Sequence, residues 1–225
     1  MPAVVVIGVD GCPDGWVAVV LSDGAVDVAH VPSIDGLDAL APAGTITAID
    51  IPMWFPTTPP RRSEVAARSV LGAKRASSIF PTPIRAAIEA PDHATANAIS
   101  KQRAGRGVSA QAYALTAKIR EVDAWRGRTE LDVREVHPET SFAVLLDGPA
   151  RYAKKTWAGI GERRLALAEV GIDLAPFEDR ALGRAAVDDV VDAAVAAWTA
   201  LRIVRGDALR LPEDPGTDPD DAIWA

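Results

Sequence analysis

The chain of 225 residues has only one cysteine, Cys12, and three histidines. A single cysteine cannot form an intrachain disulfide bond, and the spacing of Cys and His excludes structural zinc. Long apolar runs are also missing. Every apolar tract, including the one after Asp192, ends well before the roughly 18 residues that a membrane-spanning helix needs. We therefore expect no disulfide and no membrane partner.

The first residues, Met1 to Val4, carry no basic side chain before a strand-like segment. This pattern is not that of a signal peptide, so we expect a cytoplasmic protein. Hydrophobic residues make up 48% of the chain and charged residues 24%, which is enough to bury a sizeable core and keep the surface polar. One domain with an inserted lobe is the expected organisation.

The net charge of −7 argues against a protein that coats nucleic acid in general. The charge is uneven, however, because residues 61–128 hold 13 Lys and Arg but only 5 Asp and Glu. A basic segment within an acidic chain suits a phosphate-rich partner that is held beside an acidic site. Solubility of helical surfaces explains the same segment about as well.

The hydrophobic pattern predicts strands, then a helical region, then further α/β elements. A buried strand at 3–9 ends in Asp10, and a meander follows with strands at 16–21 and 25–31. Ser33 can cap a short helix, and a fourth strand at 45–51 contains Asp50. The remaining predicted elements are helices near 61–72, 91–103 and 108–126, a last strand at 134–138, and helices near 160–170 and 184–204.

This order predicts an α/β fold with a mixed five-stranded sheet and helices on both faces, as in ribonuclease-H-like folds. The domain is expected to span residues 1–211, with a helical insertion at about 53–128. Residues 212–225 contain three prolines and five acidic residues, so we expect them to form a loosely packed acidic tail.

Four aspartates lie at the ends of elements that such a fold would bring close together. Asp10 and Asp50 end strands, and Asp189 and Asp192 lie one turn apart near the start of the last long helix. Carboxylates gathered in this way repel one another unless a cation neutralises them, and Mg²⁺ or Mn²⁺ prefers such oxygen ligands. The alternative is that each aspartate only forms a turn or caps a helix, as Asp188 and Asp189 would at a helix N-terminus.

Other residues could support that site. His137 and Glu139 follow the last predicted strand and could add a metal ligand or a general base, unless Glu139 merely caps the next helix. Glu121 and Asp123 lie near Lys118 on one helix, where surface pairing explains them equally well. Cys12 fits a small residue packed at a turn better than a nucleophile.

Basic residues near two loops could hold a phosphate backbone. Two arginines flank the loop at residues 77–83, and three basic residues precede or begin a later helix whose first amides could also bind phosphate. Ordinary surface charge is the alternative for all of them. These candidate substrate-binding residues are Arg75, Arg85, Lys154, Lys155 and Arg163.

An ordered set of motifs resembles the domain-of-unknown-function family 429 over roughly residues 4–212. The motifs are Gly-Val-Asp-Gly-Cys at 8–12, Gly-Trp at 15–16, Ile-Asp-Ile-Pro at 49–52, Ser-Ser-Ile-Phe-Pro-Thr-Pro at 77–83 with Arg85, Lys-Ile-Arg-Glu-Val-Asp at 118–123, His-Pro-Glu at 137–139, Lys-Lys at 154–155 and Asp-Val-Val-Asp-Ala at 189–193. The resemblance implies a ribonuclease-H-like fold and a predicted nuclease activity. Two departures are Trp54, where glycine is usual, and Ser63-Glu64, where Cys-Asp is expected.

Junction resolvases of the RuvC type are similar in a more distant way. They carry acidic residues on the first strand, at the end of the fourth and in an Asp-x-x-Asp-Ala motif on the last helix. In this chain the matching positions are Asp10, Asp50, Asp189 and Asp192. The similarity implies that these four bind the metal ions. Glu139 is added as a candidate catalytic residue because of its place after the last predicted strand.

Three functions compete at this level. The first is a metal-dependent nuclease that hydrolyses phosphodiester bonds through two ions. The second is an actin-like ATPase or sugar kinase, which needs two such domains where 225 residues supply one. The third is a ribonuclease-H-like scaffold that binds nucleic acid, nucleotide or protein without cutting it. No motif selects DNA, RNA or a junction as substrate, or an oligomeric state.

Overall fold

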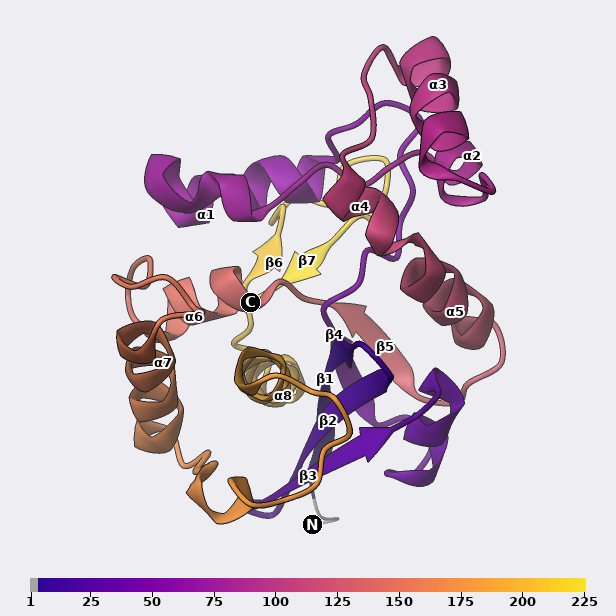
Figure 1. The fold of residues 1–225 in the computed structure, drawn as a ribbon. Coiled ribbons are helices and arrows are strands. Elements are labelled where there is room, and N and C mark those ends of the chain that lie inside the picture. The colour runs from indigo at the N-terminus through magenta and orange to yellow at the C-terminus, as the bar shows by residue number, and fades with distance from the viewer. Residues whose placement is uncertain (1–3) are drawn as a thin grey trace.

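A computed structural model describes residues 4–225 (Figure 1). Its main sheet has five strands: β1 (Val5–Cys12), β2 (Gly15–Ser22), β3 (Ala25–Val31), β4 (Ile46–Ile49) and β5 (Asp132–Glu135). The spatial order is β3-β2-β1-β4-β5. The first three strands form an antiparallel meander, whereas β4 and β5 run parallel to β1. The predicted mixed five-stranded sheet is confirmed, although Ala3 of the first predicted strand lies outside the described residues.

Helices cover both faces of this sheet, as predicted. One face packs against α8 (Val187–Arg205), with α6 (Pro138–Leu145) and α7 (Trp157–Glu169) beside it. The other face packs against the short 3₁₀ helix η1 (Ile34–Ala39) and α5 (Thr116–Arg126). The Ser33 hydroxyl accepts a hydrogen bond from the Asp35 amide at 3.3 Å, so Ser33 caps η1 as expected.

Helix α8 lies very close to the central strand because Gly8 has no side chain. A Cβ atom at Gly8 would lie 2.0 Å from the Ala197 nitrogen and 2.1 Å from the Ala193 oxygen, far inside van der Waals contact. The alanines of α8 provide the matching flat surface. This contact fixes how far the N-terminal end of α8 reaches along β1, and therefore where Asp192 lies.

The predicted insertion between β4 and β5 contains five α-helices: α1 (Arg62–Arg75), α2 (Arg85–Ile88), α3 (His93–Ala104), α4 (Ala110–Ala114) and α5, with the 3₁₀ turn η2 (Ala76–Ser78) after α1. Helices α1 to α4 lie beyond the carboxyl ends of β4 and β5 (Figure 1). The single helix predicted at 108–126 is wrong. The chain divides it at Leu115, where the Thr116 hydroxyl donates to the Tyr113 carbonyl at 2.8 Å.

The last predicted strand also ends earlier than expected. It stops at Glu135, and Pro138 begins α6, whose first turn tolerates proline because those amides have no helical partner. A 3₁₀ turn, η3 (Ala175–Phe177), lies between α7 and α8. None of the helices within residues 4–225 combines the length and apolar character needed to cross a membrane.

The expectation of a loosely packed C-terminal tail is wrong for residues 221–225, whereas residues 213–217 are exposed. Strands β6 (Arg210–Leu211) and β7 (Ile223–Trp224) pair with each other, and Trp224 bridges to Val136 beyond β5. Asp221, Ile223 and Ala225 are buried. The acidic composition misled the prediction because Asp221 is a buried counter-charge rather than a solvated residue.

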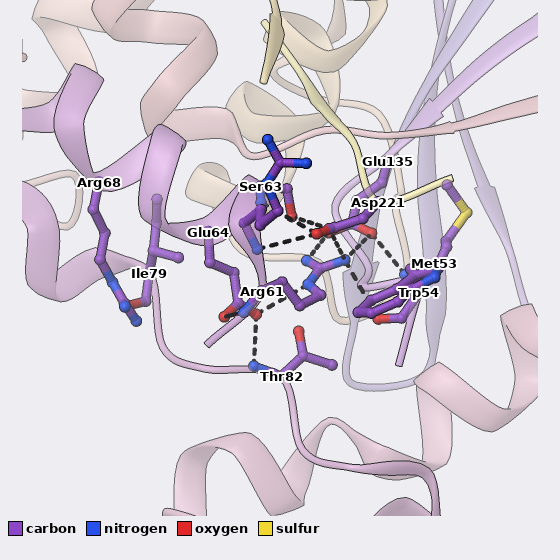
Figure 2. A network of polar contacts seen from close by, with 11 residues as sticks. Met53, Trp54, Arg61, Ser63, Glu64, Arg68, Ile79, Thr82, Glu135 and Asp221 are labelled. Carbon is purple, nitrogen blue, oxygen red and sulfur yellow. Dashed lines mark hydrogen bonds and ion pairs between the residues drawn. The ribbon is translucent and has the colours of Figure 1, made fainter. Parts of the chain in front are cut away.

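That counter-charge belongs to a buried network around Arg61 (Figure 2). The Arg61 guanidinium forms two hydrogen bonds with the Glu135 carboxylate, one of them at 2.8 Å from Nη1, and its Nε bonds Glu64 at 3.1 Å. Asp221 lies 3.9 Å from Nη1 and accepts a 2.5 Å hydrogen bond from the Ser63 hydroxyl. Thus one cation is surrounded by three carboxylates.

Backbone amides supply the remaining positive potential. The Met53 amide donates to Glu135 at 2.7 Å, and the Thr82 amide donates to Glu64 at 2.6 Å. Burial raises the pKa of Glu135 above its ordinary value, although the charge of Arg61 opposes the effect. Burial also disfavours the charge of Arg61, but the carboxylates, Glu135 first, raise its pKa on balance. The network joins β5, α1, two loops and the C-terminal segment.

Arg61→Met should lower the free energy of unfolding by about 3–5 kcal/mol, because it leaves buried carboxylates without their shared cation. Arg62→Met is the matched control, since the Arg62 side chain is 52% exposed and its loss should cost less than about 0.5 kcal/mol. Chemical denaturation followed by circular dichroism measures both. Equal destabilisation by the two substitutions would contradict the role given to Arg61.

Candidate functional site

A cavity of about 1280 Å³ lies at the carboxyl ends of β1, β4 and β5, between the sheet, the start of α8 and the inserted helices. All five carboxylates singled out from the sequence border it: Asp10, Asp50, Glu139, Asp189 and Asp192. They come from segments up to 182 residues apart in the chain. The fold thus gathers acidic side chains at one end of the sheet, as predicted.

Parallel pairing places Asp10 beside Asp50. Val9 of β1 stands next to Ile49 of β4, and the Asp50 amide donates to the Val9 carbonyl at 3.2 Å. The following residue on each strand is therefore an aspartate at the same edge of the sheet. The buried β-branched residues before each aspartate fix this register, because a slip by one residue would turn them to the wrong face.

Helix α8 adds two aspartates with different surroundings. Asp189 accepts a hydrogen bond from the Ala186 amide at 2.8 Å, so it also caps the helix, as the alternative interpretation proposed. Asp192 is one turn further along the helix and is 1% exposed. Its Oδ1 atom is buried and has no hydrogen-bond partner among the described residues. Such an atom is costly to bury unless something positive approaches it.

The carboxylates raise one another's pKa values. Burial raises the pKa of Asp10 well above its ordinary value, and the charges of Asp50 and Asp192 add to the effect. Burial and then the charge of Asp192 raise the pKa of Asp50 to about 7. Burial raises the pKa of Asp192 to about 6 even though Lys154 opposes it. A site of this kind holds protons near neutral pH, or a cation in their place.

Lys154 supplies one positive charge directly. Its Nζ atom lies 2.5 Å from Asp192 Oδ2, and its side chain is 37% exposed toward the cavity. Burial disfavours the ammonium, but Asp192, Asp50 and Asp10 together raise the pKa of Lys154 above its ordinary value. The ammonium and the aspartates therefore stabilise each other in their charged forms.

The four aspartates share the cavity without forming a tight cluster. No three of Asp10, Asp50, Asp189 and Asp192 bring one oxygen atom each within 4.8 Å of one another. Mutual repulsion and the Lys154 contact both favour this separation. A shared ion would require the side chains to rotate toward one another.

Glu139 lies 8% exposed in the cavity wall, and Arg163 holds it there. Arg163 Nη2 and Nε bond Glu139 Oε1 at 2.6 and 3.1 Å, and Nη1 bonds the Tyr152 and Gly159 carbonyls. The side chain of Arg163 is fully buried. The prediction that Arg163 binds substrate phosphate is therefore corrected, since its donors are engaged inside the protein.

Three of the other four predicted basic residues border the cavity: Arg75, Lys154 and Lys155. Arg75 Nη2 donates to the Ala150 carbonyl at 3.0 Å, and Lys155 is 80% exposed at 3.8 Å from Asp188. Arg85 is not part of the cavity lining. It pairs with Asp123 at 2.8 Å and lies over the Phe55 ring, which corrects its predicted contact with substrate.

The structure also assigns the residues that the sequence left open. Glu121 accepts hydrogen bonds from the Trp16 indole at 3.1 Å and the Ile34 amide at 2.8 Å, so it joins α5 to the meander. Asp123 is the partner of Arg85. His137 borders the cavity, and burial lowers its pKa to about 4, so its imidazole is neutral at pH 7.

Sequence reasoning missed Lys118 as a cavity residue. Its Nζ donates to the Gly15 carbonyl at 2.6 Å and lies 4.0 Å from the centre of the Trp16 ring. Burial lowers the pKa of Lys118. The sequence shows only a lysine three residues before Glu121, a spacing that also describes an ordinary surface pair.

Comparison with curated proteins and with solved structures yields no match. One family model matches, described as "Protein of unknown function (DUF429)", and it covers residues 8–217. The match includes Asp10, Asp50, the two aspartates of α8 and the lysine that contacts Asp192. It spans most of the sequence and confirms the resemblance read from the motifs, so the chain belongs to the DUF429 family.

Proposed function

We propose that the chain has a ribonuclease-H-like fold and hydrolyses phosphodiester bonds in nucleic acid with the help of Mg²⁺ or Mn²⁺. The strand order and the antiparallel meander followed by two parallel strands are consistent with that fold. The observation that carries the proposal is the meeting of Asp10, Asp50 and Asp192 in one cavity. Repulsion among these carboxylates costs stability unless positive charge approaches them, and Lys154 is the one cation in direct contact among the described residues.

The donor set fits a hard divalent ion. The available ligands are carboxylate oxygens, which Mg²⁺ and Mn²⁺ prefer. The buried Oδ1 atom of Asp192 has no partner among the described residues, and the pKa values of Asp10 and Asp50 are raised by their neighbours' charges. Asp10, Asp50, Asp189 and Asp192 would hold the ions. Bound ions would activate water and neutralise charge on the phosphate that is attacked.

The basic residues of the cavity would position the substrate. Lys155 is mostly exposed at the border, and Arg75 also borders the cavity, so both can contact a phosphate backbone. Lys154 lies deeper and shares its charge with Asp192. Contacts of this kind set the register of a nucleic acid without reading its bases. The basic residues of the cavity therefore favour recognition of the nucleic-acid backbone over recognition of the base sequence.

Glu139 is suited to hold a proton or a water molecule in this site. Its Oε1 atom is fixed by two hydrogen bonds from Arg163, which keeps the carboxylate in one orientation. A general base must be held within hydrogen-bond reach of the proton that it takes. Arg163 acts here as a positioning residue, and Glu139 as a candidate base or ligand.

The second candidate function is a scaffold that binds nucleic acid without cutting it. One observation favours it: Lys154 already neutralises part of the acidic charge, and the aspartate oxygens stay further apart than a shared ion requires. In that case the lysine would be a permanent partner of Asp192. The two functions differ in whether the aspartates bind a metal ion.

Purified protein should cleave at least one nucleic acid in the presence of Mg²⁺ or Mn²⁺, and a chelator should stop the reaction. Single strands, duplexes, hybrids and branched junctions of DNA and RNA form the panel, and gel electrophoresis measures the products. Asp10→Asn should lower the rate by roughly 10² or more, the usual cost of removing one group that stabilises charge in an active site.

Asp27→Asn is the matched control, because Asp27 lies on β3, is 62% exposed and pairs with Arg180 outside the cavity. Its rate should equal that of the unmodified protein. Binding without cleavage anywhere on the panel would favour the scaffold. Cleavage that Asp10→Asn leaves unchanged would indicate a contaminating nuclease.

Mn²⁺ should also raise the melting temperature, since an ion that binds only the folded state stabilises it. At a hundred times the dissociation constant the gain is about 2.7 kcal/mol, or roughly 5–10 °C for a chain of this size. Asp192→Asn should abolish the gain. Lys154→Met should enlarge it, because the ion then replaces the missing ammonium. Equal gains in all three proteins would place the ion elsewhere.

A further inference from the structure

A second group of metal-ligand side chains lies beside the carboxylate site. Among residues 4–225, Cys12, Asp14 and His30 are the one set of three that each bring a ligand atom within 4.8 Å of the other two. The atoms are a sulfur, a carboxylate oxygen and an imidazole nitrogen. Cys12 and Asp14 also border the large cavity. The proposed nuclease chemistry uses none of the three.

The meander brings these residues together by its register. Cys12 ends β1 opposite Gly15, so Asp14 stands in the tight turn between β1 and β2. His30 on β3 pairs with Val17, two residues beyond that turn. Spacing along the sequence does not show the group, because 16 residues and a second turn separate Asp14 from His30.

Two of the three distances between the ligand atoms match those around a tetrahedral zinc ion, and the third is within 4.8 Å. His30 Nε2 lies 3.3 Å from Asp14 Oδ1, and Cys12 Sγ lies 3.5 Å from the same oxygen. Bond lengths of about 2.1 Å to nitrogen and oxygen and about 2.3 Å to sulfur place such pairs roughly 3.4 and 3.6 Å apart at tetrahedral angles. The existing arrangement therefore needs little movement to accept an ion.

Two glycines let the backbone approach the imidazole closely. A Cβ atom at Gly15 would lie 3.0 Å from His30 Nε2. A Cβ atom at Gly183, which has φ of +61°, would lie 2.7 Å from His30 Nε2 and 2.8 Å from Asp14 Oδ2. His30 Nε2 is buried and makes no hydrogen bond with a described residue. This nitrogen without a hydrogen bond, and not the glycines, is the observation that points to a ligand here.

The carboxylate is held in place independently of the other two groups. Both oxygens of Asp14 accept from the Arg184 amide, at 3.0 and 3.1 Å. Arg184 follows Gly183, so the segment that packs against His30 also fixes Asp14. Asp14 Oδ1 also accepts from Cys12 Sγ at 3.5 Å, and that lone pair becomes available to an ion when the thiol proton leaves.

We propose that Cys12, Asp14 and His30 bind a divalent transition-metal ion, with Zn²⁺ as the best match. Thiolate and imidazole ligands select Zn²⁺ over Mg²⁺, and the two anionic ligands balance its charge once the thiol proton has left to solvent. Structural zinc sites use four protein ligands, whereas this site has three and an open position beside the cavity. A small anion or water is the ligand that such an open position accepts.

The test uses Co²⁺ as a coloured substitute for Zn²⁺ in the full-length protein. Stoichiometric Co²⁺ should give ligand-field absorption bands and a thiolate-to-cobalt charge-transfer band, and one equivalent of Zn²⁺ should remove both. Cys12→Ser should abolish the charge-transfer band. His30→Gln should weaken Zn²⁺ binding at least tenfold in competition with a chromophoric chelator. Circular dichroism confirms that each variant is folded.

Two controls separate this site from others. His93→Gln removes a histidine that bonds the Val108 carbonyl in the insertion, and it should leave Zn²⁺ affinity unchanged. Asp10→Asn should leave the charge-transfer band unchanged, because that aspartate belongs to the carboxylate site. The proposal is overturned if no charge-transfer band forms, if the band survives Cys12→Ser, or if only Asp10→Asn reduces Zn²⁺ binding.

Discussion

The buried charge of Arg61 is the constraint on which the shape of this molecule depends. Its guanidinium is paired with three carboxylates, one each from the sheet, α1 and the C-terminal segment. These three parts of the chain must therefore meet at Arg61. A buried arginine without them would be prohibitively costly. Because Glu135 is the last residue of β5, the ion pairs of Arg61 also hold the inserted helices over the carboxyl ends of the parallel strands. The cavity is the space that this arrangement leaves.

Charge balance then links that frame to the chemistry of the cavity. The carboxylates of the Arg61 network share one buried guanidinium and also accept hydrogen bonds from backbone amides and the Ser63 hydroxyl. The aspartates on the other side of the cavity have only Lys154 as a cation in direct contact. Burial, and then the charge of neighbouring carboxylates, raises the pKa values of Asp10 and Asp50. An added cation would relieve this repulsion among the aspartates, whereas the carboxylates around Arg61 already have their partners.

The local pattern of apolar residues predicted the sheet and the placement of its aspartates, because both depend on residues that are neighbours in the sequence. The β-branched runs before Asp10 and Asp50 indicate buried parallel strands, whose carboxyl ends must share an edge. The roles of Arg163 and Asp221 depend on partners far away in the chain, 24 residues distant for Glu139 and 158 for Ser63. From residue type alone, both side chains are predicted to be solvated charges. Only the tertiary structure reveals that they are buried and paired.

The turn between β1 and β2 shows how one short segment can serve two kinds of ligand chemistry. Successive residues of a strand point to opposite faces, so Asp10 and Cys12 lie on one side and the turn carries the chain on to Asp14. Asp10 faces hard oxygen ligands from β4 and α8, whereas Cys12 and Asp14 face an imidazole from β3. The two groups, if they bind the ions proposed above, would select different ones because their donor atoms differ in softness. An ion in one group would then leave the other available, with a single cavity bordered by residues of both.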